Sequence, residues 1–138
     1  MSEVPARDDY GMRVTVLIGY GLFLLGLVNG VTAIAGVILA YIKRGEARGT
    51  IWAGHFRNLI VVFWVGAVLA LAMLGVLLPG AVTLLWSLVH TDGNPPPELV
   101  GTLFAVLPLL GLISLVFLVW YLYRTIGGLV RAVDGQPY

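Results

Sequence analysis

The chain has 138 residues, of which 59% are hydrophobic and 11% are charged, and its formal net charge at pH 7 is +1. Soluble domains carry about 25% charged residues, so this chain lacks the polar surface of a water-soluble fold, and its small net charge provides no basic field for nucleic acid. The absence of cysteine excludes disulfides, thiolate metal sites and cysteine nucleophiles. The composition therefore predicts an all-α integral membrane protein.

Three stretches, 14–42, 58–89 and 99–123, contain no Asp, Glu, Lys or Arg. A membrane-crossing helix needs about 20 mainly apolar residues, and each stretch is longer than that. We therefore predict a transmembrane domain over residues 14–123. A polar cytoplasmic tail, 1–13, precedes it and an amphipathic cytoplasmic tail, 124–138, follows it.

The first apolar stretch is too long for one upright helix. Its 29 residues would extend about 43 Å at 1.5 Å per residue, against a hydrocarbon core of about 30 Å. Asn29 and Gly30 in the middle favour a turn, and Asn29 can cap a second helix. We expect a broken, partly re-entrant helix hairpin, with Gly26 and Gly30 as a helix-packing pair. The alternative is one tilted crossing, which gives three spans in all.

The positive-inside rule favours the hairpin. It places all eight Lys and Arg residues in the cytoplasm, whereas a single crossing leaves Arg7 and Arg13 outside. The loop 43–57 is then cytoplasmic, the Pro-rich loop 90–98 lies outside, and the C-terminus is cytoplasmic. This pattern predicts a multi-pass membrane protein.

The second and third apolar stretches are expected to be two full transmembrane helices. In the second, Gly66 and Ala70 form a small-residue face for helix packing, and Pro79 with Gly80 should break or kink the helix. Beyond the third, Ile126, Leu129, Val130 and Val133 recur at helical spacing, which predicts a short C-terminal interfacial helix.

The basic residues of the cytoplasmic side have two explanations. They orient the protein by the positive-inside rule, and they can also bind anionic lipid headgroups at about 1 kcal/mol per residue near the surface. The residues expected to contact lipid in this way are Lys43, Arg44, Arg48 and Arg131.

No catalytic constellation is recognisable in the sequence. His55 and His90, the two histidines, flank the second apolar stretch and should lie at opposite interfaces, each with a solvated or helix-capping role. The apolar stretches carry no ionisable pair for proton-coupled transport, and no Gly-rich phosphate loop is present. We therefore expect no enzyme activity, no cofactor and no metal site.

A pattern of residues is spread over roughly 14–135. Its principal positions are His55, Phe56, Arg57, Phe63, Trp64, Trp120, Arg124 and Gly128, and it also includes residues within 32–41 and Leu129. This pattern resembles a family of short uncharacterised bacterial inner-membrane proteins. That family is distantly similar to the multi-span component of the chloroplast inner-envelope protein-import machinery. The resemblance implies several membrane helices and a cytoplasmic C-terminus. Leu59, Val61 and Val62 stand where the family tends to carry Gln and Arg-Thr.

These observations predict a small non-enzymatic membrane protein, an accessory, assembly or stabilising subunit. Its partners would be anionic lipids and either a larger membrane-protein complex or further copies of itself, with no nucleic acid. The alternative function is a pore or translocation component.

Overall fold

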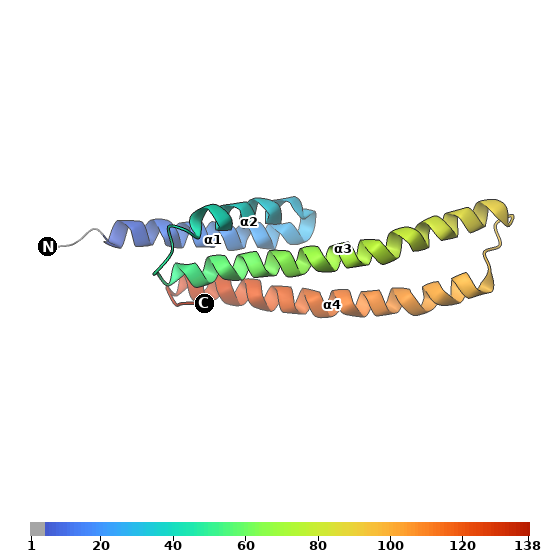
Figure 1. Ribbon diagram of the computed structural model, residues 1–138. Coiled ribbons are helices and arrows are strands. Elements are labelled where there is room, and N and C mark those ends of the chain that lie inside the picture. The colour runs from blue at the N-terminus through green and yellow to red at the C-terminus, as the bar shows by residue number, and fades with distance from the viewer. Residues whose placement is uncertain (1–4) are drawn as a thin grey trace. The chain divides into compact units, whose positions relative to one another are not determined.

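The computed structural model describes residues 5–138, with side chains from Asp9 onward. Over these residues the chain forms four α-helices, α1 Pro5–Asn29, α2 Val31–Lys43, α3 Trp52–His90 and α4 Pro97–Val133 (Figure 1). Helices α1, α3 and α4 are long and apolar enough to cross a membrane, whereas α2 is a shorter apolar helix. The predicted all-α membrane fold is confirmed.

The chain divides into two compact units. The bundle unit comprises the residues up to Val65 together with Trp120–Tyr138, and the hairpin unit comprises Gly66–Val119. The bundle unit thus contains α1, α2, the first part of α3 and the last part of α4. The hairpin unit contains the remainder of α3 and α4 with the turn between them.

The predicted break in the first apolar stretch is confirmed at Gly30, so α1 and α2 form a hairpin (Figure 1). Gly30 has φ 69°, a left-handed conformation in which a side chain would be strained. The Asn29 Oδ1 accepts hydrogen bonds from the Thr32 backbone N–H at 3.1 Å and the Thr32 hydroxyl at 3.2 Å. Gly30 is the N-cap residue of α2 and has no side chain, so Asn29, one residue earlier, bonds an N–H of the first turn instead.

The buried core of the bundle unit consists of one stripe from each helix. Each stripe follows helical spacing, so one face of every helix points inward. The largest fully buried side chains include Trp52, Tyr20, Phe23, Phe56 and Leu59. The apolar stripe predicted at the C-terminal end of α4 lies outside this core, because Ile126, Val130 and Val133 are about half exposed while Thr125, Gly128 and Ala132 are buried.

The hairpin unit has almost no buried side chain of its own. Ser87 is the one buried residue between Gly66 and Val119. The long α3 continues through Pro79, so the predicted break there does not interrupt the helix. The Thr83 hydroxyl donates to the Pro79 carbonyl oxygen at 2.8 Å. Helices in lipid tolerate an internal proline more readily than helices in water.

Several boundaries differ from the sequence-based ones. Helix α1 begins at Pro5, so much of the tail 1–13 is helical, and α3 begins at Trp52, which shortens the loop 43–57 to residues 44–51. The loop 90–98 shortens to residues 91–96. Residues 124–133 continue α4 instead of forming a separate interfacial helix. Local polarity marks where apolar stretches end, but helices extend into polar sequence wherever packing supports them.

Candidate functional site

A chain of polar groups, buried at its centre by Tyr20, His55 and Asn58, crosses the core of the bundle unit. The Tyr20 hydroxyl lies 3.1 Å from the His55 Nδ1, and the Asn58 Nδ2 donates to the same hydroxyl oxygen at 3.1 Å. The Arg124 Nε donates to the Asn58 Oδ1 at 2.8 Å, and the His55 Nε2 lies 2.8 Å from the Gln136 carbonyl oxygen. These contacts link α1, α3, α4 and the segment after α4.

For a neutral His55 ring, the direction of every hydrogen bond in this chain follows from its two ends. An arginine can only donate and a carbonyl oxygen can only accept, so the His55 Nε2 carries the hydrogen toward Gln136. The His55 Nδ1 of the neutral ring then accepts from the Tyr20 hydroxyl, whose oxygen accepts from Asn58. All five groups are satisfied in one arrangement, which strengthens each bond in a buried environment.

Tyr20 is held by its surroundings as well as by these bonds. Its ring lies edge-on to His55, with centroids 5.8 Å apart. A Cβ built at Gly128 of α4 would collide with the Tyr20 ring and hydroxyl. Nearby, the Tyr121 hydroxyl donates to the Phe23 carbonyl oxygen at 2.6 Å. Gly128 therefore provides the space that the central tyrosine occupies.

The residues after α4 fold back onto the start of α3. Gly135 has φ 66°, and the Gln136 backbone N–H donates to the Arg131 carbonyl oxygen at 2.8 Å, the pattern of a glycine helix stop. Tyr138 then lies between two cations, with the guanidinium carbons of Arg124 and Arg131 at 5.1 Å and 5.6 Å from its ring centroid. Burial raises the pKa of the Tyr138 phenol, and the two arginines oppose that shift.

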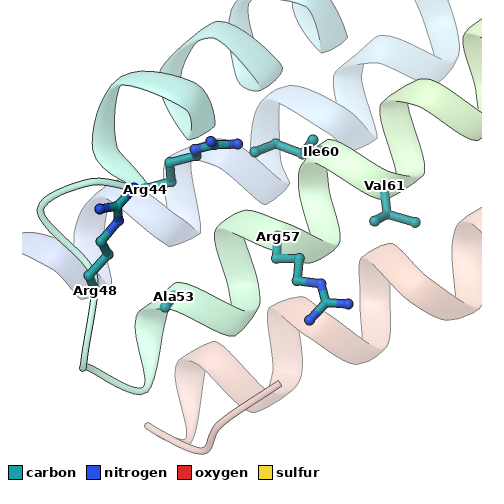
Figure 2. Close-up of a pocket in the computed structure, with 6 residues that line it drawn as sticks. All are labelled: Arg44, Arg48, Ala53, Arg57, Ile60 and Val61. Carbon is teal, nitrogen blue, oxygen red and sulfur yellow. The ribbon is translucent and has the colours of Figure 1, made fainter.

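Two cavities open on the surface of the bundle unit, one on each side of Arg57. The first, about 270 Å³, is lined by Arg44, Arg48, Ala53, Arg57, Ile60 and Val61 (Figure 2). The second, about 350 Å³, is lined by Gly54, Arg57, Asn58, Val61, Arg124 and Tyr138. In Figure 2 the Arg44 side chain points toward Ile60, and the Arg57 side chain points toward α4. Both cavities combine guanidinium groups with apolar walls.

The structure brings part of the resemblance motif together. His55, Arg124 and Gly128 all belong to the buried polar chain or its tyrosine pocket, and Phe56 is fully buried beside them. The expectation that His55 has a solvated or helix-capping role is wrong, because its side chain is 0% exposed and bonded at both nitrogens. Helix packing at the start of α3 removes it from solvent.

The other motif residues lie around this core. Trp120 lies under the Arg124 guanidinium, 5.6 Å from centroid to guanidinium carbon. Phe63 contacts Trp64 edge-on, and the Trp64 Nε1 donates to the Tyr41 hydroxyl at 2.8 Å. Arg57 is exposed and takes no part in the polar chain, but it lines both cavities.

The other predicted contact residues have mixed placements. Lys43 pairs with Glu46 at 2.7 Å, and Arg131 lies against Tyr138 rather than at either cavity. Gly26 packs on Ala33 of α2, and Gly66 packs on Phe117 of α4. Gly30 forms the turn, and Ala70 is exposed.

His90 is the last residue of α3 and is exposed, which agrees with the solvated role predicted for it. Its Nδ1 lies 2.8 Å from the Trp86 carbonyl oxygen, and its ring stacks on the Trp86 ring at 3.9 Å. These contacts hold the imidazole against the last turn of the helix.

Sequence reasoning missed Tyr20, Asn58, Gln136 and Tyr138. The available signal was the pair His55 and Asn58, two polar residues one helical turn apart at the start of an apolar stretch. Such a pair on one face points inward when the rest of that face is apolar. Among the residues that the structure describes, no group of three His, Asp or Glu side chains is placed to hold a metal ion.

Comparison with known proteins gives no assignment. No protein-family model, curated protein or solved structure matches the chain.

Proposed function

We propose that the chain is a non-enzymatic accessory or assembly subunit whose hairpin unit packs against a larger membrane complex or against further copies of itself. The observation that carries this proposal is a set of glycines on the hairpin unit that face open space. A Cβ added at Gly75 on α3, or at Gly101 or Gly111 on α4, would meet no heavy atom within 4 Å beyond the local backbone of its own helix.

Glycine inside a helix is unfavourable by about 1 kcal/mol relative to alanine, so its use there needs a compensating contact. Gly66 has one within the chain, because its Cβ position lies 3.1 Å from the Phe117 ring. Gly75 follows Gly66 by nine residues, or two and a half helical turns, and so lies on the opposite face. Small residues on lipid-exposed faces let a second helix approach closely.

The bundle unit supports a structural rather than catalytic role. Both nitrogens of His55 and both polar atoms of the Asn58 side chain are engaged inside the protein. A general base needs a free nitrogen within reach of its substrate. The polar chain instead fixes the relative positions of α1, α3 and α4 within this unit.

The distribution of charge supports the proposed orientation. All eight Lys and Arg residues belong to the bundle unit, whereas the hairpin unit carries Asp92 and Glu98 and no Lys or Arg. By the positive-inside rule the loop and tails that carry these basic residues would face the cytoplasm. The bacterial inner membrane and the family assignment remain predictions that rest on the resemblance.

The packing proposal is tested by two substitutions at the same position. We expect Gly75→Leu to reduce co-purification of the native partner, or self-crosslinking in native membranes, by about tenfold, because a large side chain blocks close approach. Gly75→Ala keeps a small surface and is the matched control, which should retain the interaction. The same pair at Gly101 extends the test to α4. If the leucine and alanine variants associate equally well, these faces are not packing surfaces.

A further inference from the structure

The surface around Arg57 has the features of a lipid site. We propose that it binds one anionic phospholipid, with the headgroup phosphate among the arginines and an acyl chain along the exposed apolar stripe of α3. This inference concerns the bundle unit and does not depend on the proposed packing role of the hairpin unit.

The first argument is charge. Four guanidinium groups line the two adjoining cavities, from Arg44, Arg48, Arg57 and Arg124. Among the described side chains the one ion pair is between Lys43 and Glu46, so none of these arginines is neutralised by a carboxylate there. Guanidinium groups bind phosphate oxygens in pairs through parallel hydrogen bonds.

The start of α3 adds to this positive field. The helix begins at Trp52, and Ala53 and Gly54 in its first turn line the first and second cavity respectively. Backbone N–H groups at a helix N-terminus favour a nearby anion. Arg57 follows one turn later, so the dipole and the guanidinium act on the same region.

The second argument is the order of side chains along α3. Arg57, Val61, Trp64 and Val65 recur at intervals of four, three and one residues, which places them on one face of the helix. All four are exposed. This face therefore begins with a cation and continues with apolar groups, over about 12 Å at 1.5 Å per residue. A phospholipid has the same sequence of groups, an anionic headgroup followed by an acyl chain.

Aromatic residues indicate where this face lies relative to the membrane surface. The Trp64 Nε1 donates to the Tyr41 hydroxyl at 2.8 Å, and the Arg44 guanidinium carbon lies 5.3 Å from the Tyr41 ring centroid. Tryptophan and tyrosine prefer the boundary between headgroups and hydrocarbon. The arginines lie at that boundary or beyond it, where phosphate groups are found. The apolar walls distinguish a lipid from free phosphate as the ligand.

The test measures lipid binding to the purified full-length chain in detergent by native mass spectrometry. Phosphatidylglycerol and phosphatidylcholine with identical acyl chains are titrated separately. We expect phosphatidylglycerol to bind at least about tenfold more tightly, because both lipids carry the phosphate but the arginines repel the choline cation of phosphatidylcholine. Equal affinity for the two lipids would overturn the proposal.

Matched variants separate a site from general attraction. Arg57→Gln should weaken phosphatidylglycerol binding by about tenfold. Arg13→Gln removes the same charge from a side chain that lines neither cavity, and it should change binding less than about twofold. Arg48→Gln, in the loop, gives a second cavity variant that leaves the helices intact. Equal losses in the cavity and control variants would show only a diffuse electrostatic effect and would contradict the site.

A competition experiment with inorganic phosphate completes the test. Millimolar phosphate should displace bound phosphatidylglycerol no more than chloride at the same ionic strength, because the acyl contacts are missing from free phosphate. Strong displacement by phosphate alone would identify a soluble phosphate ligand and reject the lipid.

Discussion

Asn58 of α3 and Arg124 of α4 bond to each other in both directions. The Arg124 Nε donates to the Asn58 Oδ1 at 2.8 Å, and the Asn58 Nδ2 lies 3.2 Å from the Arg124 carbonyl oxygen, to which it donates. The pair therefore fixes both the side chain of Arg124 and the backbone of α4 at that turn. Asn58 also donates to the Tyr20 hydroxyl, which in turn donates to the His55 Nδ1.

Replacing Asn58 by an apolar residue of similar size should destabilise the bundle unit. Asn58→Leu leaves a cationic nitrogen of Arg124 without its partner, and we expect a loss of about 2–3 kcal/mol. The measurement is unfolding in mild detergent by heat or by added denaturing detergent. Asn94→Leu, at an exposed position in the turn between α3 and α4, should change stability by less than about 0.5 kcal/mol. Equal effects of the two variants would contradict a role for the buried pair.

Tyr20→Phe removes one hydroxyl from the middle of the polar chain. The His55 Nδ1 and one Asn58 hydrogen then lose their partner, and we expect a cost of about 1–3 kcal/mol. The control is Tyr123→Phe, since Tyr123 is 75% exposed. A wild-type melting temperature for Tyr20→Phe would mean that water replaces the hydroxyl at no cost.

Gly128→Ala and Gly127→Ala should have opposite effects. A methyl group at 128 collides with Tyr20, whereas the Cβ position at 127 has no such neighbour within 4 Å. We expect Gly128→Ala to destabilise by about 1–3 kcal/mol through overpacking. Gly127→Ala should be neutral or gain up to about 1 kcal/mol from helix propensity. Thermal unfolding of the two purified variants measures these changes in stability. If both variants change stability in the same direction, Gly128 does not approach Tyr20 closely.

The α1–α2 hairpin gives a similar pair. The Cβ position at Gly26 lies 2.7 Å from the Ala33 Cβ and 3.1 Å from the Ala33 backbone nitrogen, while that at Gly21 faces open space. Because backbone cannot move aside cheaply, Gly26→Ala should destabilise by about 1–3 kcal/mol and Gly21→Ala should not. Limited proteolysis near Gly30 provides a local readout, with faster cleavage expected only for Gly26→Ala.

Topology is tested with single cysteines, since the chain has none of its own. We expect Asn94→Cys, in the turn between α3 and α4, to react with a membrane-impermeant thiol reagent added to intact cells. Ser2→Cys, which lies outside the described residues, should be protected until the membrane is permeabilised. Labelling of Ser2→Cys in intact cells would place the N-terminus outside and would support a single crossing by the first apolar stretch.

The elements that local chemistry dictates were predictable from sequence. The absence of charge over long stretches predicts membrane helices because an apolar environment penalises charged side chains. The break at Gly30 was predictable because Asn29 and Gly30 suit a turn and a cap. The sequence left open whether Pro79 breaks or kinks the helix, and the structure shows that α3 continues through it. Helices in lipid tolerate an internal proline more readily than helices in water, which favours the continuous helix.

The buried polar chain was not predictable, because its members are far apart in sequence. Tyr20 precedes Asn58 by 38 residues, and Asn58 precedes Arg124 by 66. Spacing along one helix indicates which face a residue occupies, but it does not indicate which residue of another helix lies opposite. The interpretation of His55 as a solvated residue followed from its position between polar and apolar sequence, where either environment is chemically reasonable.

The division of charge between the two units has a consequence for membrane insertion. If the Lys and Arg residues stay on the inner side by the positive-inside rule, the turn between α3 and α4 must cross the membrane. The charged side chains in and beside this turn are Asp92 and Glu98. A membrane potential that is negative inside drives anions outward, by about 2.3 kcal/mol per charge at 100 mV. The potential would therefore assist the passage of the turn between α3 and α4, and dissipating it with an uncoupler should slow that passage.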